Sequence, residues 1–101
     1  MSKAPLSTSG TRVLKILKVL KGYTLTGLSN GDIAKALNES PANITRALQT
    51  LIEEGFVIKL DNGLFAHSVQ MLQIAQAHAN HFAKMQDQIT EMQQRIHAGS
   101  R

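Results

Sequence analysis

The segment from Leu28 to Phe65, LSNGDIAKALNESPANITRALQTLIEEGFVIKLDNGLF, decides the fold. Its apolar spacing predicts one helix over residues 30–37 and a second over residues 41–54, with a three-residue turn between them. Two apolar runs follow, separated by residues 61–63, which read Asp-Asn-Gly. Asn-Gly between apolar runs is a strong hairpin signal. The order predicts a mainly α winged helix-turn-helix of three helices plus a β-hairpin wing.

Capping residues mark the ends of these two helices. Ser29 is a favourable N-cap for the first, and Asp32 completes a pattern resembling a capping box. Ser40 is the expected N-cap of the second, followed by Pro41, whose missing N–H costs nothing at the first helical position. Gly55 is expected to end that helix.

A helix that precedes this segment is predicted over residues 11–21 and is ended by Gly22. The apolar stripe expected to face the core consists of Val13, Ile16, Leu17 and Leu20. Leu14 and Val19 lie outside that stripe. They either widen the core face or pack on a partner subunit, and the sequence does not separate the two interpretations.

The chain is expected to divide into four parts. Residues 1–10, rich in Ser and Thr, predict a disordered tail that is either inert or an arm reaching DNA. Residues 11–67 form the predicted winged helix-turn-helix domain. Residues 68–97 form a long helix capped by Ser68, and residues 98–101 a short tail.

Composition limits the location and the partner. The 101 residues contain no Cys and carry a formal charge of +4, with a pI near 9.8. The first 50 residues hold seven of the 11 Lys and Arg but only two acids, a distribution typical of proteins that bind a polyanion. No apolar run approaches the ~20 residues that span a bilayer. We expect a cytoplasmic protein without a membrane contact.

The helix over residues 41–54 has two contrasting faces. The stripe expected to be buried consists of Ile44, Ala47, Leu48, Leu51 and Ile52. The opposite face presents Ala42, Thr45, Arg46 and Gln49, flanked by Asn43 and Thr50. Arg can bind guanine, Gln or Asn can bind adenine, and Thr can contact thymine. Exposed N–H groups near Ala42 and Asn43 suit a phosphate. These residues therefore predict a helix that contacts DNA.

The wing is a weaker DNA candidate. Lys59 and Asn62 are its obvious polar contacts, whereas Asp61 would repel a phosphate. The alternative is a hairpin that mainly covers the core through Phe56, Ile58 and Phe65.

The long C-terminal helix carries a heptad pattern. Ala75, Phe82, Ile89 and Ile96 occupy a positions, and Met71, His78, Met85 and Met92 occupy d positions. This spacing predicts a coiled-coil homodimer through Phe82, Met85, Ile89, Met92 and Ile96, with Leu14 and Val19 as further candidates. The alternatives are a higher oligomer and a helix that folds back on its own domain.

No pattern indicates catalysis, a cofactor or a metal. The chain shows no nucleophile with a base, paired carboxylates or phosphate-binding loop. His78 and His81 are three residues apart on the last helix, but two ligands are too few for a metal site. We therefore expect no enzyme activity, no cofactor and no metal ion.

Residues from about Arg12 to Ala75 resemble the DNA-binding domain of IclR-type transcriptional regulators. The similarity lies in VLKILKVLKG, LSNGDIAKALNESPANITRALQTLIEEGFV and the wing DNGLF. It implies a dimer on palindromic DNA, with the helix over residues 41–54 in the major groove. By position, the resemblance implies DNA contacts by Ser40, Asn43, Thr45, Arg46 and Gln49. Family members usually continue into an effector-binding domain, so this shorter chain is expected to stand alone and bind no small-molecule effector.

The leading hypothesis is a dimeric, sequence-specific protein that binds double-stranded DNA and regulates transcription, most simply as a repressor acting by occupancy. Two alternatives remain open. One is a DNA-binding accessory protein of a phage or mobile element, serving replication or transposition. The other is a winged-helix adaptor that binds proteins.

Overall fold

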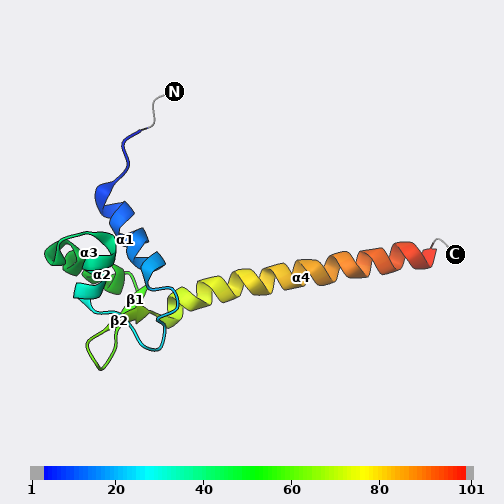
Figure 1. The fold of residues 1–101 in the computed structure, drawn as a ribbon. Helices are drawn as coiled ribbons and strands as arrows, with labels where there is room; N and C mark the ends of the chain where they lie inside the picture. The colour runs from blue at the N-terminus through cyan, green and yellow to red at the C-terminus, as the bar shows by residue number, and fades with distance from the viewer. Residues whose placement is uncertain (1–3, 100–101) are drawn as a thin grey trace. The chain divides into compact units, whose positions relative to one another are not determined.

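The computed structural model describes residues 4–99, which belong to two separate units (Figure 1). The first unit is Met1–Met71 and the second is Leu72–Arg101. The elements are α1 (Thr8–Val19), α2 (Asn30–Leu37), α3 (Pro41–Glu53), β1 (Val57–Lys59), β2 (Phe65–His67) and α4 (Val69–Gly99). Three helices and an antiparallel hairpin make the first unit a winged helix-turn-helix, which confirms the predicted fold class.

The helix-turn-helix follows the capping residues closely. Ser29 Oγ accepts a hydrogen bond from the Asp32 amide at 3.0 Å, so α2 begins where the sequence predicted. Asn38 adopts a left-handed conformation (φ 54°) that ends α2. Ser40 Oγ then accepts from the Asn43 amide at 3.2 Å, and Pro41 is the first residue of α3. The turn between the two helices is therefore fixed by local hydrogen bonds.

Helix α1 begins earlier than predicted. Ser7 Oγ accepts from the Gly10 amide at 3.0 Å, so the helix starts at Thr8 and includes residues that we expected in a disordered tail. The hydroxyl side chain of Ser7 acts as an N-cap, a role we had not assigned to this stretch. At the other end α4 continues to Gly99, beyond the predicted limit. Residues 1–3 and 100–101 of the two predicted tails lie outside the described residues.

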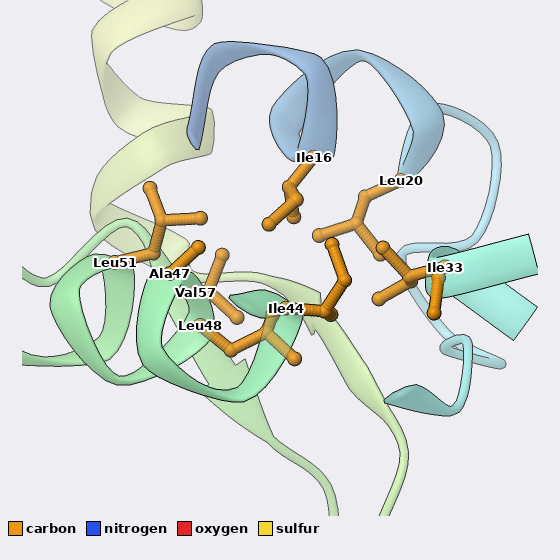
Figure 2. Packing of buried hydrophobic residues seen from close by; sticks show 9 residues of the cluster. Ile16, Leu20, Ile33, Ile44, Ala47, Leu48, Leu51 and Val57 are labelled. Atoms are coloured by element: carbon orange, nitrogen blue, oxygen red, sulfur yellow. The ribbon is translucent and has the colours of Figure 1, made fainter. Parts of the chain in front are cut away.

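The core of the first unit lies between α1, α2, α3 and β1 (Figure 2). Its fully buried large side chains are Ile16, Leu20, Ile33, Ile44, Leu48 and Val57. Figure 2 shows the α3 side chains extending toward those of α1 and toward Val57 of the wing. The inner face of α3 therefore packs on the remainder of the domain.

Two apolar residues expected in this core are partly exposed. Ile52 at the end of α3 is 39% exposed, and Ile58 in β1 is 42% exposed. Successive side chains of a strand point to opposite faces. Since Val57 is buried, the adjacent Ile58 projects from the other face. Phe56 and Phe65 pack against the core as expected for a wing that covers it.

The wing closes with a three-residue loop. Val57 pairs with His67, Ile58 with Ala66, and Lys59 with Phe65. The Leu60 amide donates to Leu64 O at 2.7 Å, and the Gly63 amide donates to Leu60 O at 2.9 Å. Gly63 (φ 84°) supplies the left-handed position that such a loop requires.

The segment before α2 is held against the wing by an isolated β-bridge. Leu28 and Phe65 exchange two backbone hydrogen bonds, of 2.9 and 2.8 Å. Gly27 has φ 74°, and a Cβ atom there would lie 2.8 Å from Leu64 Cβ and 3.1 Å from Phe65 O. The close approach therefore requires glycine both for its conformation and for the space it leaves.

Substitution of Gly27 tests this approach. Gly27→Ala should destabilise the domain more than Gly22→Ala, because Gly22 also has a positive φ (87°) but would meet nothing within 4 Å. The positive φ should cost each variant about 1–2 kcal/mol. The clash should cost Gly27→Ala a further ~1–3 kcal/mol. Urea unfolding of both variants measures the difference, and equal losses would show that the bridge yields to a methyl group.

The end of the wing leads into α4 through a buried cap. Ser68 is 5% exposed, and its hydroxyl donates to Gly55 O at 2.5 Å and accepts from the Met71 amide at 3.0 Å. The predicted role of Ser68 as the cap of the last helix is confirmed. The Ser68 side chain thus joins Gly55, two residues after the end of α3, to the first turn of α4.

The second unit consists of α4 from Leu72 onward. No residue of α4 is buried, and the large apolar side chains of this unit are exposed, from 41% at Leu72 to 65% at Ile96. Within residues 4–99, no helix combines the length and apolar character needed to cross a bilayer.

Candidate nucleic-acid interface

The outer face of α3 is polar and accessible. Ala42, Thr45, Arg46, Gln49 and Thr50 are exposed, and Asn43 is half-buried. The opposite stripe of the same helix, comprising Ile44, Ala47, Leu48 and Leu51, is buried. Burial of this stripe fixes the rotation of α3 about its axis, so the polar residues are presented together on one surface.

Hydrogen bonds within the protein restrict the two threonines. Thr45 Oγ1 donates to Pro41 O at 2.9 Å and accepts from Asn30 Nδ2 at 2.8 Å. Thr50 Oγ1 donates to Arg46 O at 3.1 Å. A hydroxyl has a single proton to donate. In this arrangement the hydroxyl proton of Thr45 is already used within the protein.

Asn43 holds Arg46. Arg46 Nη2 donates to Asn43 Oδ1 at 2.5 Å, and Asn43 Nδ2 donates to Glu39 Oε2 at 3.4 Å. The guanidinium has further N–H groups that point elsewhere, so Arg46 can still bind an acceptor pair. Both sides of the Asn43 amide are engaged, so this residue is a support for Arg46. The predicted contact of Asn43 with DNA stays a prediction.

The beginning of α3 differs from the expected phosphate site in one respect. The Asn43 amide donates to Ser40 Oγ, so it is already paired in the free protein. In this conformation the N-cap therefore occupies the Asn43 amide. The predicted phosphate contact at the start of α3 stays a prediction. The Ser40 hydroxyl accepts that bond and keeps its own proton for donation.

Two hollows flank α3. One, of about 450 Å³, is lined on the α1 side by Ser7, Ser9 and Arg12 and on the α3 side by Asn43, Arg46 and Thr50. The other, of about 250 Å³, lies toward the wing and is lined by Asn30, Thr45, Gln49, Lys59 and Phe65, among others. The polar outer face of α3, called here the recognition face, thus continues onto α1 on one side and onto β1 on the other.

The two wing candidates lie in different places. Lys59 lines the second hollow together with Gln49, and its Nζ lies 5.8 Å from the centroid of the Phe65 ring. Asn62 is at the exposed loop, where its Oδ1 accepts from the Leu64 amide at 3.0 Å. The structure therefore brings Lys59 to the α3 face, while Asn62 chiefly stabilises its own turn.

Sequence reasoning missed several residues of this surface. Asn30, Arg12 and Glu39 were not assigned to it, and Ser7 and Ser9 were included only as part of a tail that is either inert or an arm reaching DNA. Arg12 and Glu39 form an ion pair of 3.3 Å across 27 positions of sequence, which no local spacing reveals. For Ser7, the hydroxyl-rich run before α1 was an available signal, since Ser is a favoured N-cap.

The candidate dimer residues also fall into two groups. Leu14 is 59% exposed on α1, whereas Val19 packs against the core of its own domain. On α4, the heptad residues Phe82, Met85, Ile89, Met92 and Ile96 are all exposed. His78 lies against Phe82, with ring centroids 5.3 Å apart. Among residues 4–99 no cluster of metal-ligating side chains is found.

These features define a winged helix-turn-helix domain with a polar recognition helix, the architecture of DNA-binding transcriptional regulators. The chain belongs to the IclR helix-turn-helix domain family, which matches residues 9–61. The resemblance inferred from the sequence is confirmed. No curated protein matches the chain.

Solved structures show the same fold. An IclR family transcriptional regulator from Brucella abortus is 22% identical (TM-score 0.62), over 71% of this chain and 28% of that one. HmgR from Pseudomonas aeruginosa is 23% identical (TM-score 0.61), over 70% and 29%. A Zalpha domain of Cyprinid Herpesvirus 3, solved for its binding mode to Z-DNA, is 26% identical (TM-score 0.53), over 62% and 98%. The similar region is thus under a third of the two bacterial proteins.

Proposed function

We propose that this protein is a dimeric, sequence-specific double-stranded DNA-binding regulator of transcription, with α3 in the major groove. The observation that carries the proposal is the α3 face, where Arg46 and Gln49 are exposed and Arg46 is held by Asn43. Membership of the IclR helix-turn-helix family supports the same function. A bound dimer that covers a promoter would repress by occupancy.

The side chains of the face suggest a division of roles. Arg46 would bind the O6 and N7 atoms of guanine, and Gln49 the N6 and N7 atoms of adenine. The Thr45 methyl group would contact a thymine methyl. Ser40, Thr50, Lys59 and Asn62 would contact the backbone, which positions the protein without reading sequence. Ala42, which has a short side chain, would let the start of α3 approach the DNA closely.

Dimerisation would proceed through α4. Its apolar a and d residues form a stripe from Phe82 to Ile96, and Met85, Ile89 and Met92 line a shallow groove with Gln88 and Gln93. Neutral Gln side chains at the groove edges create no like-charge repulsion between two identical helices. A second copy of α4 is therefore the occupant that best matches the stripe.

Arg46→Ala tests the DNA contact. If Arg46 binds a guanine, the variant should lose about 1–3 kcal/mol of affinity for a preferred duplex and lose its preference at one base pair. Fluorescence anisotropy with the preferred duplex and with single-base variants measures both effects. Arg95→Ala removes the same charge from exposed α4 and serves as the control.

An equal loss of affinity for every duplex would contradict this role, since it would indicate that Arg46 contacts only phosphates. Unchanged binding would remove Arg46 from the interface altogether.

Ile89→Asp tests the dimer. Two carboxylates placed opposite each other at an a position should prevent pairing, so the variant should be a monomer by multi-angle light scattering. Gln94→Asp adds the same charge at an outward f position and should leave the dimer intact. A dimer that persists in Ile89→Asp at the same concentration would place the interface elsewhere, with exposed Leu14 as the next candidate.

A further inference from the structure

A series of polar contacts, called here the contact network, connects α1 with the guanidinium group of Arg46. Arg12 Nε lies 3.3 Å from Glu39 Oε1, and Glu39 Oε2 accepts from Asn43 Nδ2 at 3.4 Å. Asn43 Oδ1 in turn accepts from Arg46 Nη2 at 2.5 Å. Glu39 is in the turn between α2 and α3, so the contact network joins three separate parts of the domain.

The Glu39 carboxylate and the Arg46 guanidinium determine how the Asn43 amide between them is oriented. A carboxylate only accepts hydrogen bonds, and a guanidinium only donates them. The Asn43 amide must therefore turn its nitrogen toward Glu39 and its oxygen toward Arg46. The opposite orientation would lose both bonds. Glu39 thus determines which side of Asn43 faces Arg46.

The contact network is anchored in α1, at Arg12. The Arg12 side chain is only 15% exposed, and that of Glu39 is 28% exposed, so their ion pair is better shielded than a surface pair. Ile16, on the next turn of α1, is fully buried in the core. Arg12 also neutralises a carboxylate that would otherwise repel the DNA backbone close to the start of α3.

We propose that Arg12 and Glu39 are positioning residues that act through Asn43 to orient Arg46, and that they thereby contribute to sequence preference without contacting a base. This inference rests on the proposed function. A long Arg side chain loses rotamer freedom when it binds, and a side chain already held in one orientation loses less. The benefit applies to the bidentate contact with a base, whereas attraction to phosphates tolerates many orientations.

Glu39→Gln is the main test. In the wild type Arg12 lies against Glu39 Oε1 and Asn43 donates to Glu39 Oε2, whereas glutamine replaces one of these two oxygens with an NH₂ group, which only donates. One of the two contacts is therefore lost without a change in side-chain size. Glu53→Gln is the matched control, because it removes the same charge from an exposed residue at the C-terminal end of α3. Both variants should bind mixed-sequence DNA at least as well as the wild type, since each removes one negative charge.

The two variants should differ in discrimination. This is the affinity for the preferred duplex divided by the affinity for a duplex altered at the base pair that Arg46→Ala identifies. Glu39→Gln should lower this ratio by about threefold to tenfold, which lies in the lower part of the range measured for coupled side chains. Glu53→Gln should leave it unchanged. Equal ratios for the two variants would overturn the inference.

A double substitution tests the route. If Glu39 acts through Asn43, then Glu39→Gln should cause no further loss of discrimination in an Asn43→Ala background. Additive losses would overturn the role of Asn43 as the link. If Glu39→Gln lowers the melting temperature, Asn43→Ala provides a second, independent way to interrupt the contact network.

A measurement on the free protein separates this inference from the proposed function. Nitrogen-15 relaxation of the Arg46 Nε–H group should show a restrained side chain in the wild type and in Glu53→Gln, and a more mobile one in Glu39→Gln. Equal mobility in all three would overturn the inference even if DNA binding is specific. A wild-type protein without sequence preference would overturn the proposed function, whatever the mobility of Arg46.

Discussion

Burial of the inner face of α3 is the constraint on which the rest of the domain depends. Ile44 and Leu48 are almost fully enclosed by side chains of α1, α2 and the wing. Truncating such a residue to Ala typically costs about 2–5 kcal/mol, while a whole domain is stable by only about 5–15 kcal/mol. Because one face of α3 must face the core, the opposite face must point outward. Packing of the buried face therefore fixes the direction in which Arg46 and Gln49 project.

The recognition face combines residues that are free to bind with residues that support them. Thr45 is held by Asn30 and Pro41, and Asn43 connects Arg46 to Glu39. A polar face built only from unrestrained side chains would lose more conformational freedom on binding DNA. The internal hydrogen bonds reduce the number of free donors and acceptors but give those that remain defined directions.

Much of this architecture could be predicted from the sequence, because its signals are local. Ser29, Ser40 and Pro41 mark helix starts through contacts within a few residues, and the predicted bounds of α2 were correct. The sequence did not reveal contacts between residues that are far apart along it. The ion pair of Arg12 with Glu39 and the bond of Asn30 to Thr45 depend on how helices cross. The exposure of Ile58 depends on which face of the strand meets the core, and alternation alone does not determine this.

Selection of bound duplexes from a random pool is the most direct test of dimeric, sequence-specific recognition of DNA by this protein. If two copies each place α3 in a major groove, the enriched duplexes should contain one short motif twice, in inverted orientation. The centres of the two copies should be about one helical turn, or a multiple of it, apart. Enrichment of a single motif without a spaced partner would contradict the dimer, and a pool with no enriched motif would contradict sequence-specific recognition itself.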